Sequence, residues 1–149
     1  MKTSLKSTIL ILACIICSAL GCRADDKTAI TVSQLPKAAR TTLTKYFKNV
    51  KVNTANKERD DQSYKYHAYL KNGAKVKFDG NGKWTEVEAK GSQVPNAIVP
   101  SKILSYVKKN YKGQKIIQIE RDSEGYEVEL SNCTELHFNN KYQMVKADD

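Results

Sequence analysis

The feature that most constrains this chain is an internal repeat. The segment 64–78 recurs as the segment 124–138, with the same alternation of apolar and polar residues. Identical residues at matching positions include Leu70 with Leu130, Asn72 with Asn132, and Phe78 with Phe138. A repeat of this kind indicates that the chain is built from two copies of one supersecondary unit.

A helix is predicted ahead of each copy. Leu35-Pro36 and Val99-Pro100 place a proline where the first helical turn tolerates it. Apolar residues then recur at helical spacing: Leu35, Ala39, Leu43, Tyr46 and Phe47 in the first copy, and Val99, Ile103, Val107 and Tyr111 in the second. Each stripe would lie on a sheet.

Each predicted helix is followed by four strand-like segments, beginning at 50–55 and at 115–120. Short connections favour antiparallel pairing, because a parallel pair needs a long crossover. The predicted fold class is therefore α+β, a tandem repeat of one helix packed on a four-stranded antiparallel meander. We divide the chain into residues 25–90 and 91–149, which together form one domain.

The turn after Leu70 tests this alignment. A three-residue loop of residues 71–73 pairs Leu70 with Ala74 and makes the buried face wholly apolar, whereas a two-residue loop mixes apolar and charged residues. The same loop in the second copy puts Cys133 at the left-handed position, at a cost of about 1 kcal/mol. Cys133 is either a drifted turn residue or an exposed thiol that pairs with another chain.

The sheet face turned away from the helix is the candidate site. If Leu70, Val76, Phe78 and Val87 point at the helix, a four-residue loop over residues 79–82 predicts Lys77 opposite Trp84 and Lys75 opposite Glu86 on the other face. The predicted protein-binding residues of the first copy are His67, Tyr69, Lys75, Lys77 and Trp84. The matching face of the second copy has mainly acids: Glu127, Glu129, Glu135, His137, Met144 and Lys146.

This face has two interpretations. A sheet covered by helices on one side has a polar outer side in any case. An open face with the single tryptophan beside tyrosine and histidine is also typical of a protein-docking surface. Glu129 opposite Glu135 favours docking, since facing like charges destabilise a sheet unless a partner or Lys146 relieves them.

The N-terminus predicts export. Lys2 and Lys6 precede an apolar run over residues 9–20 that is too short to span a bilayer, so residues 1–24 are interpreted as a signal peptide cut after Ala24. In the alternative, Ala19-Leu20-Gly21-Cys22 is a lipobox and Cys22 is lipidated. The expected location is the periplasm, with a membrane anchor only through Cys22.

Processing also changes charge and cysteine content. Removing Lys2, Lys6 and Arg23, with no acids, lowers the net charge from +9 to +6. The remaining lysines are scattered among acids with no dense patch expected, so nucleic-acid binding is not predicted. Cys133 alone remains, and the two histidines have no ligand-spaced neighbours, so neither an internal disulfide, a metal nor a cofactor is expected.

The residues also carry a family resemblance. Leu35-Pro36 opening a helix, then Asn72-Gly73, Phe78-Asp79 and Gly82-Lys83-Trp84, resemble the PepSY-like, beta-lactamase-inhibitor-like proteins of bacterial periplasms. The likeness covers residues 30–147. It implies helices backing a curved antiparallel sheet, as in the beta-lactamase inhibitor protein, and no established activity for most members.

Three functions follow as hypotheses. The first is a non-enzymatic module that inhibits or chaperones another exported protein through the sheet face. The second is a small-ligand carrier or structural envelope protein, with a pocket near Phe47, Tyr66 and Phe78. The third is a hydrolase, which is disfavoured because no nucleophile has a positioned base; no catalytic residue is predicted.

Overall fold

The computed structural model describes residues 27–60 and 63–148. The predicted signal peptide and Cys22 lie outside these residues. Within the described part of the chain, no helix is both long and apolar enough to cross a membrane.

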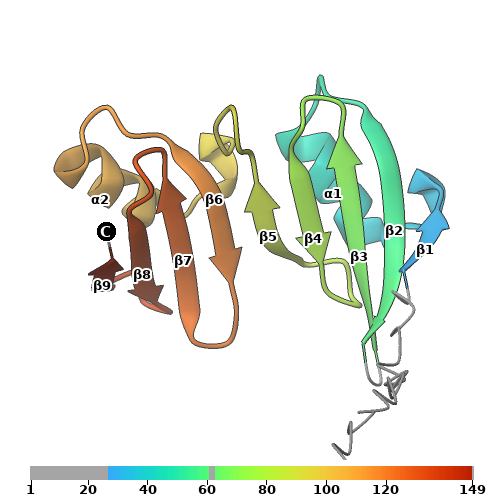
Figure 1. Cartoon of the computed structure of the whole chain (residues 1–149). Coiled ribbons are helices and arrows are strands. Elements are labelled where there is room, and N and C mark those ends of the chain that lie inside the picture. The colour runs from blue at the N-terminus through green and yellow to red at the C-terminus, as the bar shows by residue number, and fades with distance from the viewer. Residues whose placement is uncertain (1–26, 61–62, 149) are drawn as a thin grey trace, which may run out of the picture.

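Residues 27–60 and 63–148 form nine strands and two α-helices (Figure 1). The first half contains β1 (Lys27–Ile30), a 3-10 turn η1 (Val32–Gln34), α1 (Lys37–Tyr46), β2 (Val52–Asp60), β3 (Ser63–Leu70), β4 (Lys75–Phe78) and β5 (Trp84–Glu88). The second half contains η2 (Asn96–Ile98), α2 (Ser101–Asn110), β6 (Ile116–Arg121), β7 (Gly125–Leu130), β8 (Glu135–Asn139) and β9 (Met144–Asp148).

The strands form one antiparallel sheet in sequence order, from β1 to β9. The α+β class and the antiparallel sheet agree with the prediction, but the sheet is not a pair of four-stranded meanders. An edge strand, β1, precedes the first helix and was not predicted. β5 pairs with β6, with Val87 opposite Ile119, so the two halves form one continuous sheet.

Both helices lie behind this sheet, on the same face (Figure 1). Pro36 and Pro100 are the N-cap residues, and the predicted stripes of Ala39 with Leu43 and of Ile103 with Val107 are buried. Beneath the helices an unbroken buried row runs across seven strands: Ala55, Ala68, Val76, Val87, Ile119, Val128 and Leu136. Since paired residues of an antiparallel sheet share a face, this row defines the core side throughout.

The three-residue turns are as predicted. Tyr66 pairs with Phe78 and Ala68 with Val76, and the Leu70 amide donates to the Ala74 carbonyl. Gly73 has a φ of 84°, and Cys133 takes the same left-handed conformation at 68°. The second turn therefore holds a side chain in a conformation that favours glycine.

The alternation predicted for β5 is wrong. Phe78 pairs with Trp84 while Lys77 pairs with Glu86, so Thr85 is the extra residue of a β-bulge. A bulge interrupts the two-residue period, and it turns Trp84 to the core side. The second half repeats the arrangement, with Phe138 paired to Met144, His137 to Lys146, and Val145 as the extra residue.

Candidate protein-binding surface

The open face of the sheet, the one that neither α1 nor α2 covers, carries two rows of polar side chains that run from strand to strand. Row A consists of Asn56, His67, Lys77, Glu86, Glu120, Glu127, His137 and Lys146. Row B consists of Tyr69, Lys75, Glu88, Gln118, Glu129, Glu135 and Asp148. Each member of a row lies directly opposite the next member on the neighbouring strand, so the charges of neighbouring members interact across the strands.

The two lysines of the predicted site lie near the middle of the sheet. Lys77 is bonded to Glu86, and Lys75 lies 4.0 Å from Glu88. The predicted pairs of Lys77 with Trp84 and Lys75 with Glu86 are wrong, because the loop spans five residues, 79–83, instead of four, and the Thr85 bulge shifts the register by one residue more. Burial lowers the pKa of Lys77, but the bond to Glu86 and the charges of Glu86, Glu120 and Glu88 outweigh it and raise the pKa overall.

His67 lies on the open face, as predicted, yet only 5% of it is exposed. Its Nε2 is 2.9 Å from the Glu58 carboxylate, while its Nδ1 is buried and has no hydrogen-bond partner among the residues that the structure describes. Burial lowers the pKa of His67, and the charges of Lys27 and Lys75 add to this effect against the opposing pull of Glu58. A neutral, largely covered imidazole supports the sheet more than it offers a contact.

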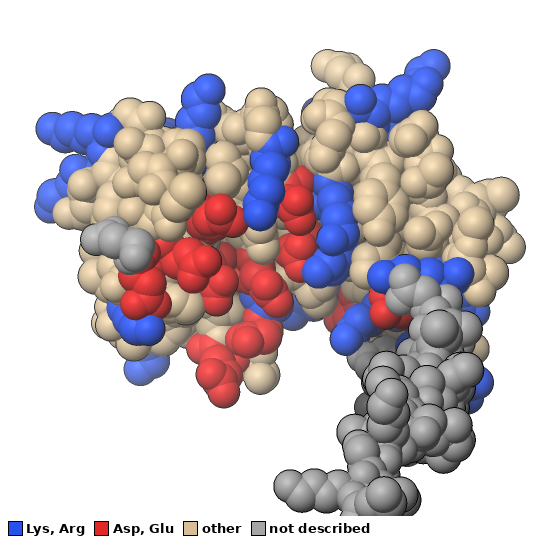
Figure 2. Space-filling view, viewed as in Figure 1, with Lys and Arg blue, Asp and Glu red and all other residues tan. Residues whose placement is uncertain are grey.

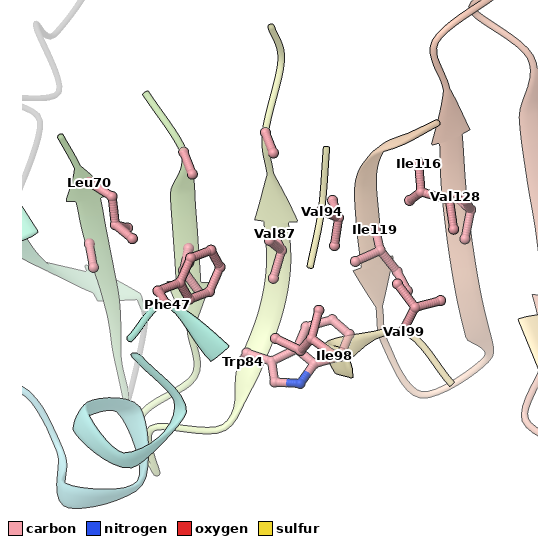
Figure 3. Close-up of a cluster of buried hydrophobic side chains, with 14 of the residues drawn as sticks. Phe47, Leu70, Trp84, Val87, Val94, Ile98, Val99, Ile116, Ile119 and Val128 are labelled. Atoms are coloured by element: carbon pink, nitrogen blue, oxygen red, sulfur yellow. The ribbon is translucent and has the colours of Figure 1, made fainter. Parts of the chain in front are cut away.

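Trp84 is not on the open face at all. Its side chain is 7% exposed and lies beside Ile98 in the core (Figure 3). The Arg121 guanidinium stacks 3.9 Å from the indole ring, and the Arg121 Nε donates to the Trp84 carbonyl at 2.6 Å. This contact fastens β5 to β6, and sequence reasoning missed it because the pairing of these strands was not predicted.

Carboxylates dominate the rows from β5 onward. Glu86, Glu120 and Glu127 face one another across three strands, and Glu129 faces Glu135 in row B. Figure 2 shows this face, with the acidic side chains gathered over the side of the sheet that the second half forms. Facing like charges destabilise a sheet, so this arrangement has a cost in the isolated molecule.

Glu120 lies at the centre of that arrangement. Lys77 bonds to Glu86, and the His137 Nδ1 lies 3.5 Å from Glu127, but among the described residues Glu120 has no ion pair within 4.0 Å. Burial raises the pKa of Glu120, and the charges of Glu86 and Glu127 raise it further. Glu120 was not among the predicted residues, although it ends the strand-like segment predicted over residues 115–120.

A hollow of about 350 Å³ opens beside these carboxylates. Its lining from the β6–β7 hairpin and β8 includes His137, four carboxylates, those of Glu120, Asp122, Glu124 and Glu127, and one guanidinium, that of Arg121. Tyr126 and Phe138 supply an apolar part of the wall. The shape and charge of this hollow suit a long cationic side chain, which would lay its methylene stem on the rings.

In row B, a residue that was not predicted, Lys90, reduces the repulsion between Glu129 and Glu135. The Lys90 Nζ lies 3.7 Å from Glu129, whereas Lys146 bonds to Asp148 at 2.7 Å. The bond to Lys146 lowers the pKa of Asp148. Lys146, the residue expected to relieve Glu129 and Glu135, is instead held at the edge strand.

The described residues contain no group of three or more histidines, cysteines, aspartates or glutamates arranged to hold a metal ion. Cys133 is exposed at the β7–β8 turn as a free thiol. The partners of that thiol are a prediction that stays open.

Comparison with known proteins identifies the family. The family model described as "Putative beta-lactamase-inhibitor-like, PepSY-like" matches residues 64–146. The chain belongs to this family. Among curated proteins, none matches significantly.

Solved structures of similar proteins share the fold of this PepSY-like protein over nearly their whole length. A "putative calcium-regulated periplasmic protein" of Bacteroides thetaiotaomicron is 42% identical with a TM-score of 0.82, and the match covers 85% of this chain and 99% of the other. A "putative periplasmic protein" of Bacteroides vulgatus is also 42% identical, with a TM-score of 0.81 and the same coverage. A second B. vulgatus protein, "of unknown function", is 34% identical with a TM-score of 0.78, over 83% of this chain and 99% of the other.

Proposed function

We propose that this PepSY-like protein is a non-enzymatic, periplasmic binding module that takes a cationic segment of another envelope protein on the open face. The observation that carries the proposal is the line of Glu86, Glu120 and Glu127 across β5, β6 and β7. A partner's lysine or arginine would neutralise Glu120, which has no ion-pair partner of its own within the described residues.

Three further points support this function. The hollow beside Glu120 has room and charge for one cationic side chain. The related structures are described as periplasmic, in keeping with the export signal predicted over residues 1–24. The two halves of the sheet share one buried row but differ in the charge of this face, as expected if one half has specialised for binding.

The binding residues differ from those expected from sequence. Tyr69, Lys75 and Lys77 stay on the docking surface as its basic end, whereas Trp84 and His67 serve the fold. The acidic rows of β6 to β8 replace them as the main contact. A partner with basic and acidic groups in matching order would cover both ends, and the charge pattern would fix its orientation.

The test is affinity capture from an envelope extract of the source cells, with matched baits. The variant with both Glu120→Gln and Glu127→Gln should lose the partner, while Glu58→Gln, at an acid of β2 that lies outside the acidic rows and the hollow, should retain it. Equal retention by all three baits would remove the acidic rows from the site. Retention by none would favour the alternative of a ligand carrier or structural envelope protein.

Calcium is a necessary variable in that experiment, because one similar protein is described as calcium-regulated. Capture should be run with calcium and with a chelator. A partner held only in one condition would connect the regulation named for the relative to this face.

A further inference from the structure

The basic residues of this protein are sorted by face in a way that the order along the chain conceals. No aspartate or glutamate occurs in residues 27–57 or in residues 89–119, the two segments that contain the helices. All acidic residues of the second half therefore lie outside α2 and its flanking turns. The sequence expectation of lysines scattered among acids is wrong for this layer of the molecule.

Eight cations of these segments are exposed on the helix side. They are Lys37, Arg40, Lys45 and Lys48 on and just after α1, and Lys102, Lys108, Lys109 and Lys112 on and just after α2. The four of α1 border one shallow hollow along the helix, together with Thr41 and Thr44. Because both helices cover the same face of the sheet, the two groups form one layer, which we name the cationic helix layer.

We infer that the cationic helix layer docks on the surface of an anionic phospholipid bilayer. Four to eight basic residues on one face are typical of recognition of anionic lipid, and each contributes about 1 kcal/mol near such a surface. The opposite, acidic side of the sheet would be repelled by the same surface. The molecule would thus bind in one orientation, with its open face directed away from the lipid.

The type of cation favours a lipid surface over a nucleic acid or a single phosphate group. Seven of the eight residues are lysines, which act as compact point charges, whereas arginine is preferred where planar, bidentate recognition of phosphate is needed. The predicted export also places the protein between two membranes.

The layer is suited to surface binding without insertion. The exposed large apolar residues of the described chain are Val32, Tyr64, Met144 and Val145, and none of them lies on α1 or α2. Binding should therefore be electrostatic and should weaken steeply with salt, since charges are screened beyond about 10 Å at 0.1 M ionic strength.

The test uses a chain that begins at Lys27, which removes Cys22 and any lipid on it. This part is expected to fold alone, because the related crystal structures consist almost entirely of it. Sedimentation is measured with vesicles of equal parts phosphatidylglycerol and phosphatidylcholine, and with vesicles of phosphatidylcholine alone. The chain should sediment with the first at low salt, should be released by salt, and should not bind the second.

Matched variants separate the helix layer from net charge. Replacing Lys108 and Lys109 by Gln should lower partition onto the anionic vesicles roughly thirtyfold. Replacing Lys90 and Lys146 by Gln removes the same charge from the open-face side and should change partition less than about fivefold. The Lys108 and Lys109 variant should keep the wild-type melting temperature, since exposed substitutions change stability little. The second variant removes the ion pairs of Lys90 with Glu129 and of Lys146 with Asp148, so its circular dichroism is recorded to verify that it is folded.

An equal loss in the two variants, or equal binding to both kinds of vesicle, would overturn the inference. So would the absence of binding at low salt. The result is independent of the protein partner, because Glu120 and Glu127 lie on the opposite face and their substitution should leave vesicle binding intact.

Discussion

The two halves of the sheet have the same turns and bulges, but their open faces differ in charge. Gly73 and Cys133 occupy equivalent left-handed turn positions, and Thr85 and Val145 are equivalent bulge residues. The Asp79 and Asn139 side chains close equivalent loops by accepting backbone N–H groups. Yet the open face is basic and aromatic around Lys75 and Lys77 and acidic across the second half. The core and turns fix the fold, and the exposed rows are free to diverge.

The largest expected difference between the halves is at the residue after each bulged loop. Trp84→Ala should lower the free energy of unfolding by about 3 to 5 kcal/mol, because the indole is buried against Ile98 and Arg121. Met144→Ala, at the equivalent position but 40% exposed, should cost less than about 1 kcal/mol. Urea unfolding followed by circular dichroism measures both, and equal costs would contradict the placement of Trp84.

The second prediction concerns how the stability of the protein depends on pH through His67. Because the pKa of His67 is held below its ordinary value of 6.5, the unfolded chain takes up this proton first as the pH falls. Stability should therefore be full above pH 6.5 and fall below it, by at most about 1.4 kcal/mol per pH unit for one proton.

The variant His67→Gln assigns that response. It should flatten the dependence of the unfolding free energy on pH between 5 and 7. Urea titrations at several pH values provide the measurement. An unchanged slope in His67→Gln would mean that another group takes up the proton.

At the left-handed turn position, each half can be given the residue that the other half has there. Gly73→Cys should destabilise the first half by about 1 kcal/mol, and Cys133→Gly should stabilise the second by up to about 1 kcal/mol, because only glycine adopts a positive φ without strain. Melting temperatures under reducing conditions measure both changes. A loss of stability in Cys133→Gly would show that the thiol makes a stabilising contact.

The smallest expected effect concerns the acidic rows. Glu120→Gln should raise the unfolding free energy by about 0.2 to 1 kcal/mol, since it removes the middle charge of three facing carboxylates. Glu124→Gln, in the turn, should change it by less. A gain in stability accompanied by loss of the partner would identify Glu120 as a residue kept for binding. A loss of stability would contradict the repulsion assigned to it.

Features of this fold could be predicted from the sequence where the residues that determine them lie close together along the chain. Helical spacing and the turn after Leu70 predicted the core, since both involve neighbours along the chain. The alternation of β5 failed because Thr85 adds one residue to the strand, and no composition signal marks it. The contact of Arg121 with Trp84 and the alignment of Glu86 with Glu120 were beyond reach, because both need the β5–β6 pairing.

That pairing also sets an order of events in folding. Most neighbouring strands of the sheet are consecutive hairpins. The exceptions are β1 with β2, which η1 and α1 separate, and β5 with β6, which η2 and α2 separate. Closing so long a connection has a larger entropic cost than closing a hairpin turn. We expect the hairpins to form first and β5 to pair with β6 only after α2 has formed. The last step of folding is then also the one that aligns the three carboxylates.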